Sequence, residues 1–295
     1  MKERKREKMP NQNKISQFVD KVLNQDALEG MKLLPDESID LIVADPPYNL
    51  GKDYGNDSDK QESEAFLRWT AEWLNLAISK LKPNGSLYIF ATWRYSPEIF
   101  VFLKSKMIML NEIIWDRRVP SMGGSTRRYS SVHDTIGFFA KSKDHYFDLD
   151  SIRIPYDEET KKARSRSIFV GKKWLEVGYN PKDLWSVSRL HRIHAEREDH
   201  PTQKPLEIVE RMVRASCPEN GIVLDPFAGT GTTAIACLLN KRRYITYELN
   251  PKYHEMILKR IKRKSNFFLE PPLPANGDAK KQQDNQMPLL FGFNT

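Results

Sequence analysis

Short apolar runs alternate with longer amphipathic stretches over most of the chain. The apolar runs predict strands at 19–24, 39–44, 86–90, 111–116, 135–140, 222–224 and 243–247. Apolar positions between them recur at helical spacing and predict a short helix that ends near Pro35, followed by helices at 62–81, 96–106, 206–216, 234–239 and 251–264. Because strands and helices alternate, the pattern predicts an α/β domain with a mostly parallel sheet that is covered on both faces.

This alternation disappears between residues 141 and 199. Within it, the segment Lys161–Glu176 holds six basic side chains against one acid, Glu176, and Phe169, Trp174 and Tyr179 lie within or close to this segment. Contact with nucleic-acid phosphates and bases requires such cationic and planar side chains together. We therefore expect an inserted recognition subdomain at 141–199. Its expected DNA contacts are Lys161, Lys162, Arg164, Arg166, Lys172 and Lys173.

A second basic stretch lies between the strands expected at 111–116 and 135–140. Gly123 and Gly124 allow this loop to hinge, and its arginines suit phosphate contact; a merely solvated loop is the alternative reading. The arginines in question are Arg117, Arg118, Arg127 and Arg128.

Charge and composition narrow the class of protein. The chain of 295 residues has 47 Lys and Arg against 39 Asp and Glu, and its net charge of +8 favours a polyanionic partner. It has no apolar run of membrane-spanning length, and its basic start lacks an apolar signal core, so we expect a cytoplasmic protein without membrane contact. We expect five parts: a basic flexible arm (1–14), one half of the α/β domain (15–140), the insert (141–199), the other half (200–264) and a tail (265–295).

The tetrapeptide Asp45-Pro46-Pro47-Tyr48 directly follows the strand expected at 39–44. Loops at the carboxyl ends of strands carry the ligand sites of open α/β sheets. Two prolines fix the backbone and donate no hydrogen bonds, so the carbonyls of Asp45 and Pro46 can face a ligand. A carboxylate and a carbonyl can together accept both hydrogens of an exocyclic amine, and Tyr48 can stack on the ring that carries this amine. A plain proline turn with an Asp cap is the alternative reading.

A glycine-containing turn follows the strand expected at 222–224. Gly229 and Gly231 allow the backbone to turn tightly and to approach a ligand closely. Asp225 can pair with a ligand ammonium, and Glu248 follows at nearly the spacing of an acid that binds ribose hydroxyls. Because the third glycine of a dinucleotide fingerprint is missing, the pattern indicates a nucleoside with an amino-acid tail.

Three other segments have a chemical and a plainer reading. Thr202, Lys204 and the helix that begins near Pro205 can hold a carboxylate, or they can form an ordinary helix start. Asp26 can accept a hydrogen bond from a ligand amine, or it can cap the next helix. The histidines of the segment 191–194 have arginine neighbours and no nearby cysteine, so we expect no metal site there.

The segments DPPY, HPTQKP and DPFAGTGTT, together with Glu248, resemble motifs of the S-adenosylmethionine-dependent amino-methyltransferases of DNA. Their order resembles that of the circularly permuted beta group, which includes the partners of bacterial restriction endonucleases. The resemblance covers roughly residues 15–264. It implies a seven-stranded, mostly parallel Rossmann-like methyltransferase sheet, circularly permuted, with one reversed edge strand in the pair at 111–140.

The resemblance also implies roles for single residues. The catalytic pocket for the target base would consist of Asp45, Pro46, Pro47 and Tyr48. The adenine of S-adenosylmethionine would contact Asp26 and Ala27, its ribose Glu248 and Leu249, and its carboxylate Thr202, Lys204 and Pro205. The methionine part and the sulfonium would be surrounded by Asp225, Phe227, Ala228, Gly229, Thr230, Gly231 and Thr232.

The implied reaction is direct methyl transfer to the N6 amine of an adenine flipped out of duplex DNA. The family implies no metal, a restriction-modification system with a cognate endonuclease, often a homodimer, and a cytoplasmic, nucleoid-associated location. In this family an aspartate at the position of Asp45 goes mostly with adenine and a serine mostly with cytosine, so cytosine-N4 methylation is the main alternative. An RNA methyltransferase and a noncatalytic DNA-binding protein are further alternatives.

Overall fold

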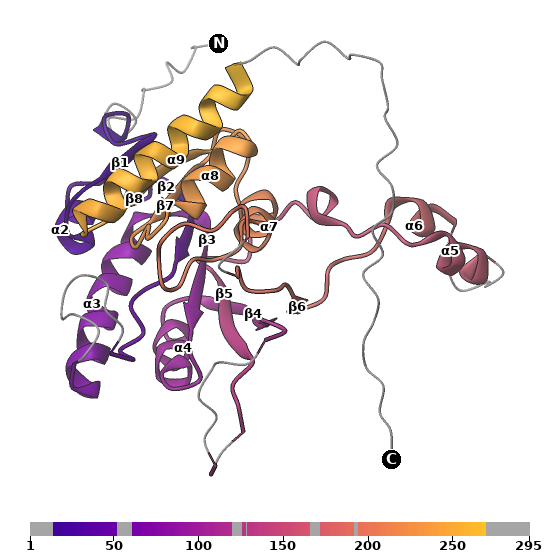
Figure 1. Cartoon of the computed structure of the whole chain (residues 1–295), viewed down its shortest axis with the longest axis horizontal. Helices are drawn as coiled ribbons and strands as arrows, with labels where there is room; N and C mark the ends of the chain where they lie inside the picture. Colours follow the sequence, from indigo (N-terminus) through magenta and orange to yellow (C-terminus); the bar gives the residue numbers. More distant parts are fainter. Residues whose placement is uncertain are drawn as a thin grey trace, which may run out of the picture.

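The structure is a computed structural model that describes residues 14–51, 61–119, 126–127, 129–165, 172–191 and 194–269. Strands and helices alternate along most of this part, as the apolar pattern predicts (Figure 1). The strands are β1 (Lys21–Leu23), β2 (Ile39–Ala44), β3 (Leu81–Ala91), β4 (Ile108–Asp116), β5 (His133–Ala140), β6 (Leu184–Ser186), β7 (Ile222–Asp225) and β8 (Arg243–Tyr247). The main helices are α2 (Ala27–Lys32), α3 (Ser63–Lys80), α4 (Ser96–Lys104), α5 (Glu158–Arg164), α6 (Lys172–Val177), α7 (Leu206–Ser216), α8 (Thr232–Leu239) and α9 (Pro251–Leu269).

The eight described strands form one sheet in the order β1-β8-β7-β2-β3-β5-β4-β6. The first five are parallel to one another, β5 is antiparallel to both of its neighbours, and β6 is parallel to β4. The expected α/β class with a mostly parallel sheet is therefore confirmed. Two details differ from the expectation, because the sheet has eight strands and its reversed strand, β5, lies inside the sheet and not at its edge.

The additional strand, β6, comes from the segment that was expected to be an insert. Leu184 pairs with Ile114 and Ser186 pairs with Asp116 of β4. Between them, the Trp185 side chain is buried, and its indole N–H donates to the carbonyl of Lys182 at 2.8 Å. This anchored three-residue strand occupies the edge of the sheet and moves the β4–β5 pair inward.

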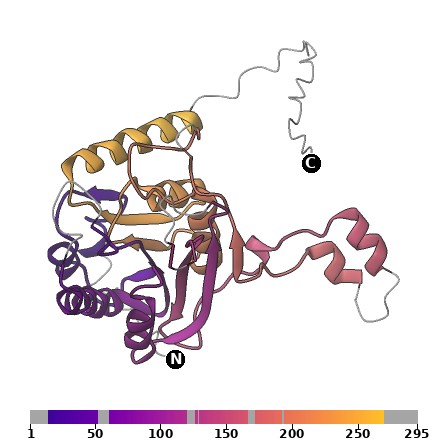
Figure 2. The same ribbon diagram turned by 60° about the horizontal axis from the view of Figure 1, so that its bottom comes forward.

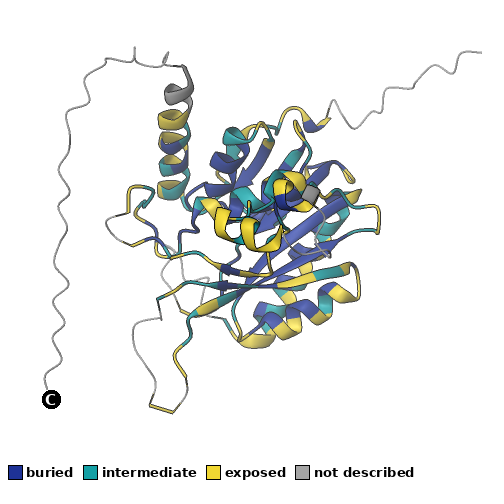
Figure 3. Ribbon diagram, turned by 90° about the vertical axis from the view of Figure 1, so that its right-hand side faces the viewer, coloured by how far each residue is buried: buried dark blue, intermediate teal, exposed yellow. Residues whose placement is uncertain are grey.

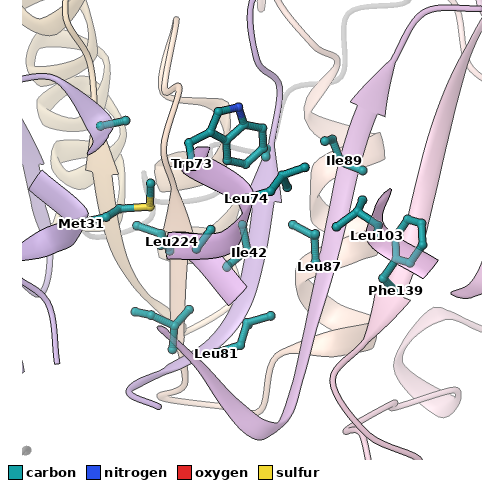
Figure 4. Packing of buried hydrophobic residues seen from close by; sticks show 14 of the residues in the cluster. Met31, Ile42, Trp73, Leu74, Leu81, Leu87, Ile89, Leu103, Phe139 and Leu224 are labelled. Carbon is teal, nitrogen blue, oxygen red and sulfur yellow. The ribbon is translucent and has the colours of Figure 1, made fainter. Parts of the chain in front are cut away.

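Helices cover both faces of the sheet and enclose two hydrophobic cores. Helices α2, α3 and α4 pack on one face, where Trp73 and Leu74 of α3 lie against Ile42 of β2 (Figure 4). Helices α7 and α8 cover the other face, toward which Leu41 and Val43 of β2 point. Successive side chains of a strand point to opposite faces, so β2 contributes to both cores and is buried along its whole length.

A buried acid joins three central strands at the opposite end from their carboxyl termini. Asp40 of β2 accepts hydrogen bonds from the Lys82 ammonium of β3 at 2.8 Å to each oxygen. Its Oδ2 also accepts from the backbone N–H of Ile222, the first residue of β7, at 2.9 Å. Residues 82–85 were expected to end a helix, but β3 begins at Leu81, directly after α3, and includes them.

Helices α5 and α6 project away from the sheet (Figure 2). Helix α5 buries none of its residues, and the projecting pair faces the viewer in Figure 3 with mostly exposed positions. At the base of the projection, Ile154 and Tyr179 exchange backbone hydrogen bonds of 2.9 Å in both directions. This antiparallel bridge joins the segment that leads out to α5 with the segment that returns from α6 to the sheet.

Candidate active site

Four carboxylic acids lie at the end of the sheet where its parallel strands finish. Asp225 is the last residue of β7, Asp45 and Glu248 directly follow β2 and β8, and Asp26 lies shortly after β1. These strands are parallel neighbours in the order β1-β8-β7-β2, so their carboxyl ends bring the acids together as Asp26, Glu248, Asp225 and Asp45. All four side chains line one cavity. Motifs that are up to about two hundred residues apart in the chain therefore meet at a single site.

Asp45 is held by two side chains of the protein itself. The Lys204 ammonium forms an ion pair with its Oδ2, and the Tyr48 hydroxyl donates a hydrogen bond to its Oδ1. The side chains of Lys204 and Asp45 are 7% and 22% exposed, so little water screens their attraction. The ammonium also lies 4.9 Å from the ring centre of Phe90 and 5.2 Å from that of Tyr48, within the range of cation–π attraction.

Tyr48, expected as the platform for the target base, lies beside the cavity with its ring buried. Its ring is buried in the core that also contains Val43 and Phe90, and it does not contribute to the described lining of the cavity. The core covers the apolar ring while Asp45 accepts from the hydroxyl, so both parts of the phenol are satisfied in this position. Stacking on a base would require Tyr48 to turn away from Asp45.

The glycine turn after β7 has a backbone that only glycine adopts easily. Gly229 and Gly231 have φ angles of +54° and +73°, in the left-handed region. A Cβ atom on Gly231 would lie 2.5 Å from Cγ2 of Ile257 in α9. The N–H of Gly229 donates to Oε2 of Glu248 at 2.8 Å, which fixes the turn to the end of β8.

Asp225 and Glu248 are buried acids whose hydrogen bonds shape the turn. Asp225 accepts from the N–H of Phe227 at 2.9 Å and from the hydroxyl of Thr233 at 2.6 Å, yet burial raises its pKa to about 7. Burial also raises the pKa of Glu248, although the N–H groups of Asn250 and Gly229 donate to its carboxylate. A cation or hydroxyl donors bound in the cavity would favour the ionised forms. The acids are thus suited to a ligand that carries such groups.

The loop before α7 forms another wall of the cavity, to which His200, Thr202, Gln203 and Lys204 contribute. The Lys204 carbonyl accepts a hydrogen bond from the Thr232 hydroxyl at 3.3 Å, which joins this loop to the glycine turn. Pro205, expected as the first helical residue, is the N-cap, and α7 begins at Leu206. Lys204 was expected to hold a ligand carboxylate, but its ammonium contacts Asp45.

Sequence reasoning missed the aromatic wall of the site. The rings of Trp69 and Trp73 lie 5.7 Å and 5.0 Å from the ring of Phe227, measured between centroids. On another side, His200 meets Tyr253 edge to face at 4.5 Å. The helical spacing of Trp69 and Trp73 predicted a buried face of α3, but it could not indicate that part of this face borders a cavity.

Most of the residues expected to bind the cofactor line this cavity, whereas Pro205 and Gly231 do not. Of the catalytic tetrapeptide, Asp45 and Pro47 line it, whereas Pro46 and Tyr48 do not. The expected cofactor residues in the lining are Asp26, Ala27, Thr202, Lys204, Asp225, Phe227, Ala228, Gly229, Thr230, Thr232, Glu248 and Leu249. Asp26 also caps α2 by accepting from the Glu29 N–H at 3.1 Å. It therefore serves as a helix cap and lines the cavity at the same time.

A buried arginine of α9 fastens the two loops that form the cavity. The Arg260 guanidinium is 4% exposed and donates to the carbonyl of Thr230 at 3.0 Å and to the hydroxyl of Thr232 at 3.1 Å. Its other nitrogen contacts Oε1 of Glu196 at 3.5 Å, and this same oxygen accepts from the N–H of Leu206 at 2.8 Å. Arg260 therefore connects the glycine turn with the segment that leads into α7.

The basic residues expected to bind DNA occupy different environments. Arg117 contacts Asp134 at 3.5 Å and the Ser131 carbonyl at 3.0 Å, so it stabilises its own loop instead of presenting a free cation. Arg118 donates to the carbonyl of Ser186 at 2.9 Å and joins β4 to β6. Arg127 is exposed. Arg128, Arg166 and the side chains of Lys172 and Lys173 lie outside the described residues.

On the projecting helix α5, Lys161 pairs with Glu158 at 2.8 Å, while Lys162 and Arg164 are exposed. The Arg164 guanidinium lies 5.2 Å from the ring centre of Tyr156. The described residues contain no group of three or more His, Cys, Asp or Glu side chains that could hold a metal ion. No helix within the described ranges is long and apolar enough to cross a membrane.

The parallel sheet, its glycine turn and the adjoining Asp-Pro-Pro-Tyr loop define an α/β enzyme of the methyltransferase type. The sequence model of the DNA methylase family that joins the N6 and N4 enzymes matches residues 39–259. The chain belongs to this family and is a DNA methyltransferase.

Known proteins with similar sequences and structures agree with this assignment. The Type II methyltransferase M.HpaI of Haemophilus parainfluenzae is 37% identical over 250 residues, which cover 84% of this chain and 76% of the relative. The DNA adenine methyltransferase YhdJ of Escherichia coli (strain K12) is 32% identical, over 84% of this chain and 85% of the relative. The crystal structure of the M1.HpyAVI–SAM complex is similar at a TM-score of 0.54 and 27% identity, covering 81% of this chain and 98% of that one.

Proposed function

We propose that this DNA methyltransferase transfers a methyl group from S-adenosylmethionine to the N6 amine of an adenine in double-stranded DNA. One observation carries the proposal: the Asp45 loop and the glycine turn follow adjacent parallel strands, β2 and β7, and line the same cavity. A nucleophile held by the first loop and a donor held by the second are thereby confined side by side. Positioning of two bound reactants is a large source of rate.

The residues of the cavity fit a nucleoside with an amino-acid tail. Glu248 offers acceptors to ribose hydroxyls, Asp225 offers a carboxylate to an ammonium, and Asp26 offers one to an exocyclic amine. Gly229 brings the turn to the cavity without a side chain, and the Trp69–Phe227 contact adds an apolar wall. When bound there, S-adenosylmethionine supplies the electrophilic methyl group.

The Asp45 loop provides the groups that handle the target base. A base in a duplex is out of reach of the cavity, so it has to be flipped out of the helix. The Asp45 carboxylate and the Pro46 carbonyl then accept the two hydrogens of the exocyclic amine and orient its lone pair toward the methyl group. Tyr48, after turning away from Asp45, covers the ring of the base.

Adenine is proposed as the target for two reasons. Asp45 matches the aspartate that accompanies adenine in the resembled group, and the 32%-identical relative YhdJ is named a DNA adenine methyltransferase. Type II methyltransferases such as M.HpaI are also among the relatives. This supports a restriction-modification system, in which a cognate endonuclease cleaves the same sequence when it is unmethylated. The methyltransferase would then act in the cytoplasm, in contact with the chromosome.

For contact with DNA, we propose that the insert supplies the projecting cations Lys162 and Arg164. Both are exposed on a helix that buries none of its residues and that stands apart from the sheet. Such a helix can reach a duplex that lies over the cavity, and its charges suit phosphates. Arg117 is not included, because its guanidinium is engaged by Asp134 and Ser131.

The test is to incubate the protein with methyl-labelled S-adenosylmethionine and unmethylated duplex DNA, digest the DNA to nucleosides, and identify the labelled nucleoside by mass spectrometry. We expect N6-methyladenine. N4-methylcytosine would replace the adenine assignment while keeping the mechanism, and label found only in RNA would contradict DNA as the substrate. Mapping the labelled positions by sequencing gives the recognition site.

A further inference from the structure

The cavity has one lysine among several acids. Of the described residues in its lining, Asp26, Asp45, Asp225 and Glu248 are acids, and Lys204 is the sole lysine or arginine. The Lys204 side chain is 7% exposed, so its ammonium is available to partners inside the site and hardly to water. A second anion that enters the cavity therefore has to share this ammonium with Asp45.

Asp45 is occupied at both oxygens before any base arrives. Tyr48 donates to Oδ1 and Lys204 donates to Oδ2, so the carboxylate has fewer lone pairs free for the two hydrogens of a base amine. Full use of Asp45 in the reaction thus requires Lys204 to move away or to be shared.

Lys204 is placed to make such an exchange. Its Nζ lies 3.4 Å from the carbonyl of Thr202, and its own carbonyl accepts from Thr232 next to the glycine turn. The side chain thus begins in the loop expected to hold the cofactor carboxylate and ends at the catalytic carboxylate. A lysine has a flexible four-carbon stem and donors in several directions, so a small rotation changes its partner.

We propose that Lys204 is a positioning residue that couples cofactor binding to base binding. The inference rests on the proposed function. The amino-acid carboxylate of the cofactor draws the Lys204 ammonium away from Asp45, and Asp45 then accepts the hydrogens of the flipped base. A ligand shifts such an equilibrium only by its different affinity for the two states, so a ligand without this carboxylate does not release Asp45. The coupling is reciprocal, and target DNA therefore tightens the binding of the carboxylate-bearing ligand.

The first experiment uses the unmodified protein and a duplex whose target adenine, identified by the methylation assay, is replaced by 2-aminopurine. Two saturating ligands are compared: S-adenosylhomocysteine, which has the amino-acid tail, and 5′-methylthioadenosine, which lacks it. With S-adenosylhomocysteine we expect the duplex to bind about tenfold more tightly and with brighter 2-aminopurine fluorescence. With methylthioadenosine we expect little change. Equal effects of the two ligands would overturn the proposal.

The second experiment compares Lys204→Met with Lys80→Met. Lys80 is a matched control, since it is also 7% exposed and ion-paired, at 2.6 Å with Asp36, but does not line the cavity. In Lys204→Met, Oδ2 of Asp45 has lost its ion pair from the start, so we expect brighter 2-aminopurine fluorescence without ligand and the same DNA affinity with either ligand. Lys80→Met should retain the difference between the ligands. Persistence of this difference in Lys204→Met would overturn the coupling, whereas failure of the wild type to methylate DNA would overturn the proposed function itself.

Discussion

Asp45 has its chemical meaning through its neighbours. A carboxylate at a strand end is common, but this one lies beside the end of β7, under the Lys204 ammonium and against the Tyr48 hydroxyl. The two partners contact both oxygens of its carboxylate in a site that little water reaches. At the scale of single residues, therefore, the availability of Asp45 to a ligand depends on which donors its carboxylate oxygens accept from.

Asp45→Ala tests the role of the carboxylate in the reaction. The substitution removes the acceptor that orients the amine, and positioned acid–base groups contribute about a hundredfold to ten-thousandfold in rate. We expect the single-turnover methylation rate to fall by at least about a hundredfold. Cofactor binding, measured by calorimetry, should be retained and should become tighter, because Lys204 no longer pairs with Asp45. Turnover close to that of the wild type would rule out Asp45 as the amine acceptor.

Asp225 predicts a pH dependence of cofactor binding. Burial raises its pKa to about 7, so much of it is protonated below neutral pH, whereas pairing with a ligand ammonium requires the ionised form. Cofactor affinity should therefore rise as the pH increases, by about tenfold between about pH 6 and about pH 8. Calorimetric titrations at both pH values measure this change. Asp225→Asn should bind more weakly at the higher pH and lose the dependence; an unchanged slope would assign it to another group.

At the scale of elements, the site depends on how two loops are fastened to α9. Arg260 reaches from this helix to the glycine turn and to Glu196, which in turn accepts from the start of α7. Burial lowers the pKa of Arg260, while the two glutamates near it act in the opposite direction. One buried cation thus fixes the position of the glycine turn relative to the Lys204 loop.

Arg260→Met tests this fastening. It leaves the half-buried Glu196 without its cation and the Thr230 carbonyl without its donor, so we expect a loss of about 3 kcal/mol of unfolding free energy, the lower end of the range for a buried pair. We expect a loss of this size in urea denaturation, together with weaker cofactor binding. Arg263→Met is the control, because Arg263 is 64% exposed and pairs with Glu198 at the surface, where a pair contributes about 1 kcal/mol or less. Similar losses in both variants would contradict a special role for Arg260.

The whole molecule divides its charge between two places. Acids gather in the cavity at the carboxyl ends of the strands, whereas helix α5, away from the sheet, carries the exposed cations Lys162 and Arg164 after two exposed glutamates in its first turn. The net charge of +8 alone favours approach to DNA, but the separation also gives that approach an orientation.

Replacing Lys161, Lys162 and Arg164 together by alanine tests the projection. Each lost phosphate contact should lower the slope of log affinity against log salt by about 0.9, and affinity should fall for all sequences alike. Fluorescence anisotropy over a salt series measures both quantities.

The control replaces three exposed lysines, Lys104, Lys106 and Lys143, by alanine. They lie at the end of the sheet where β3 and β4 begin, which is opposite to the end that carries the cavity. It removes the same charge and should leave the salt slope nearly unchanged. Equal effects of the two triple variants would indicate that net charge, and not the projection, governs binding.

The sequence by itself determined the elements and the chemistry of the motifs. Strand β8 and helix α7 have the bounds that the apolar pattern predicted, because buried runs and helical faces are local features. The Asp45 loop, the glycine turn and Glu248 could be recognised for a related reason. Turns that need glycine or proline, and acids at strand ends, leave a mark in a few consecutive residues.

Only the tertiary structure decided which residues meet across the fold. Lys204 lies on Asp45, Tyr48 is buried beside it, and Arg260 fastens two loops, although nothing in the local sequence joins these partners. The addition of β6 to the sheet edge likewise depends on three residues that pair with a strand about seventy positions earlier. Such contacts are long-range, because they depend on the spatial order of the strands in the sheet and not on the residue pattern within any one strand.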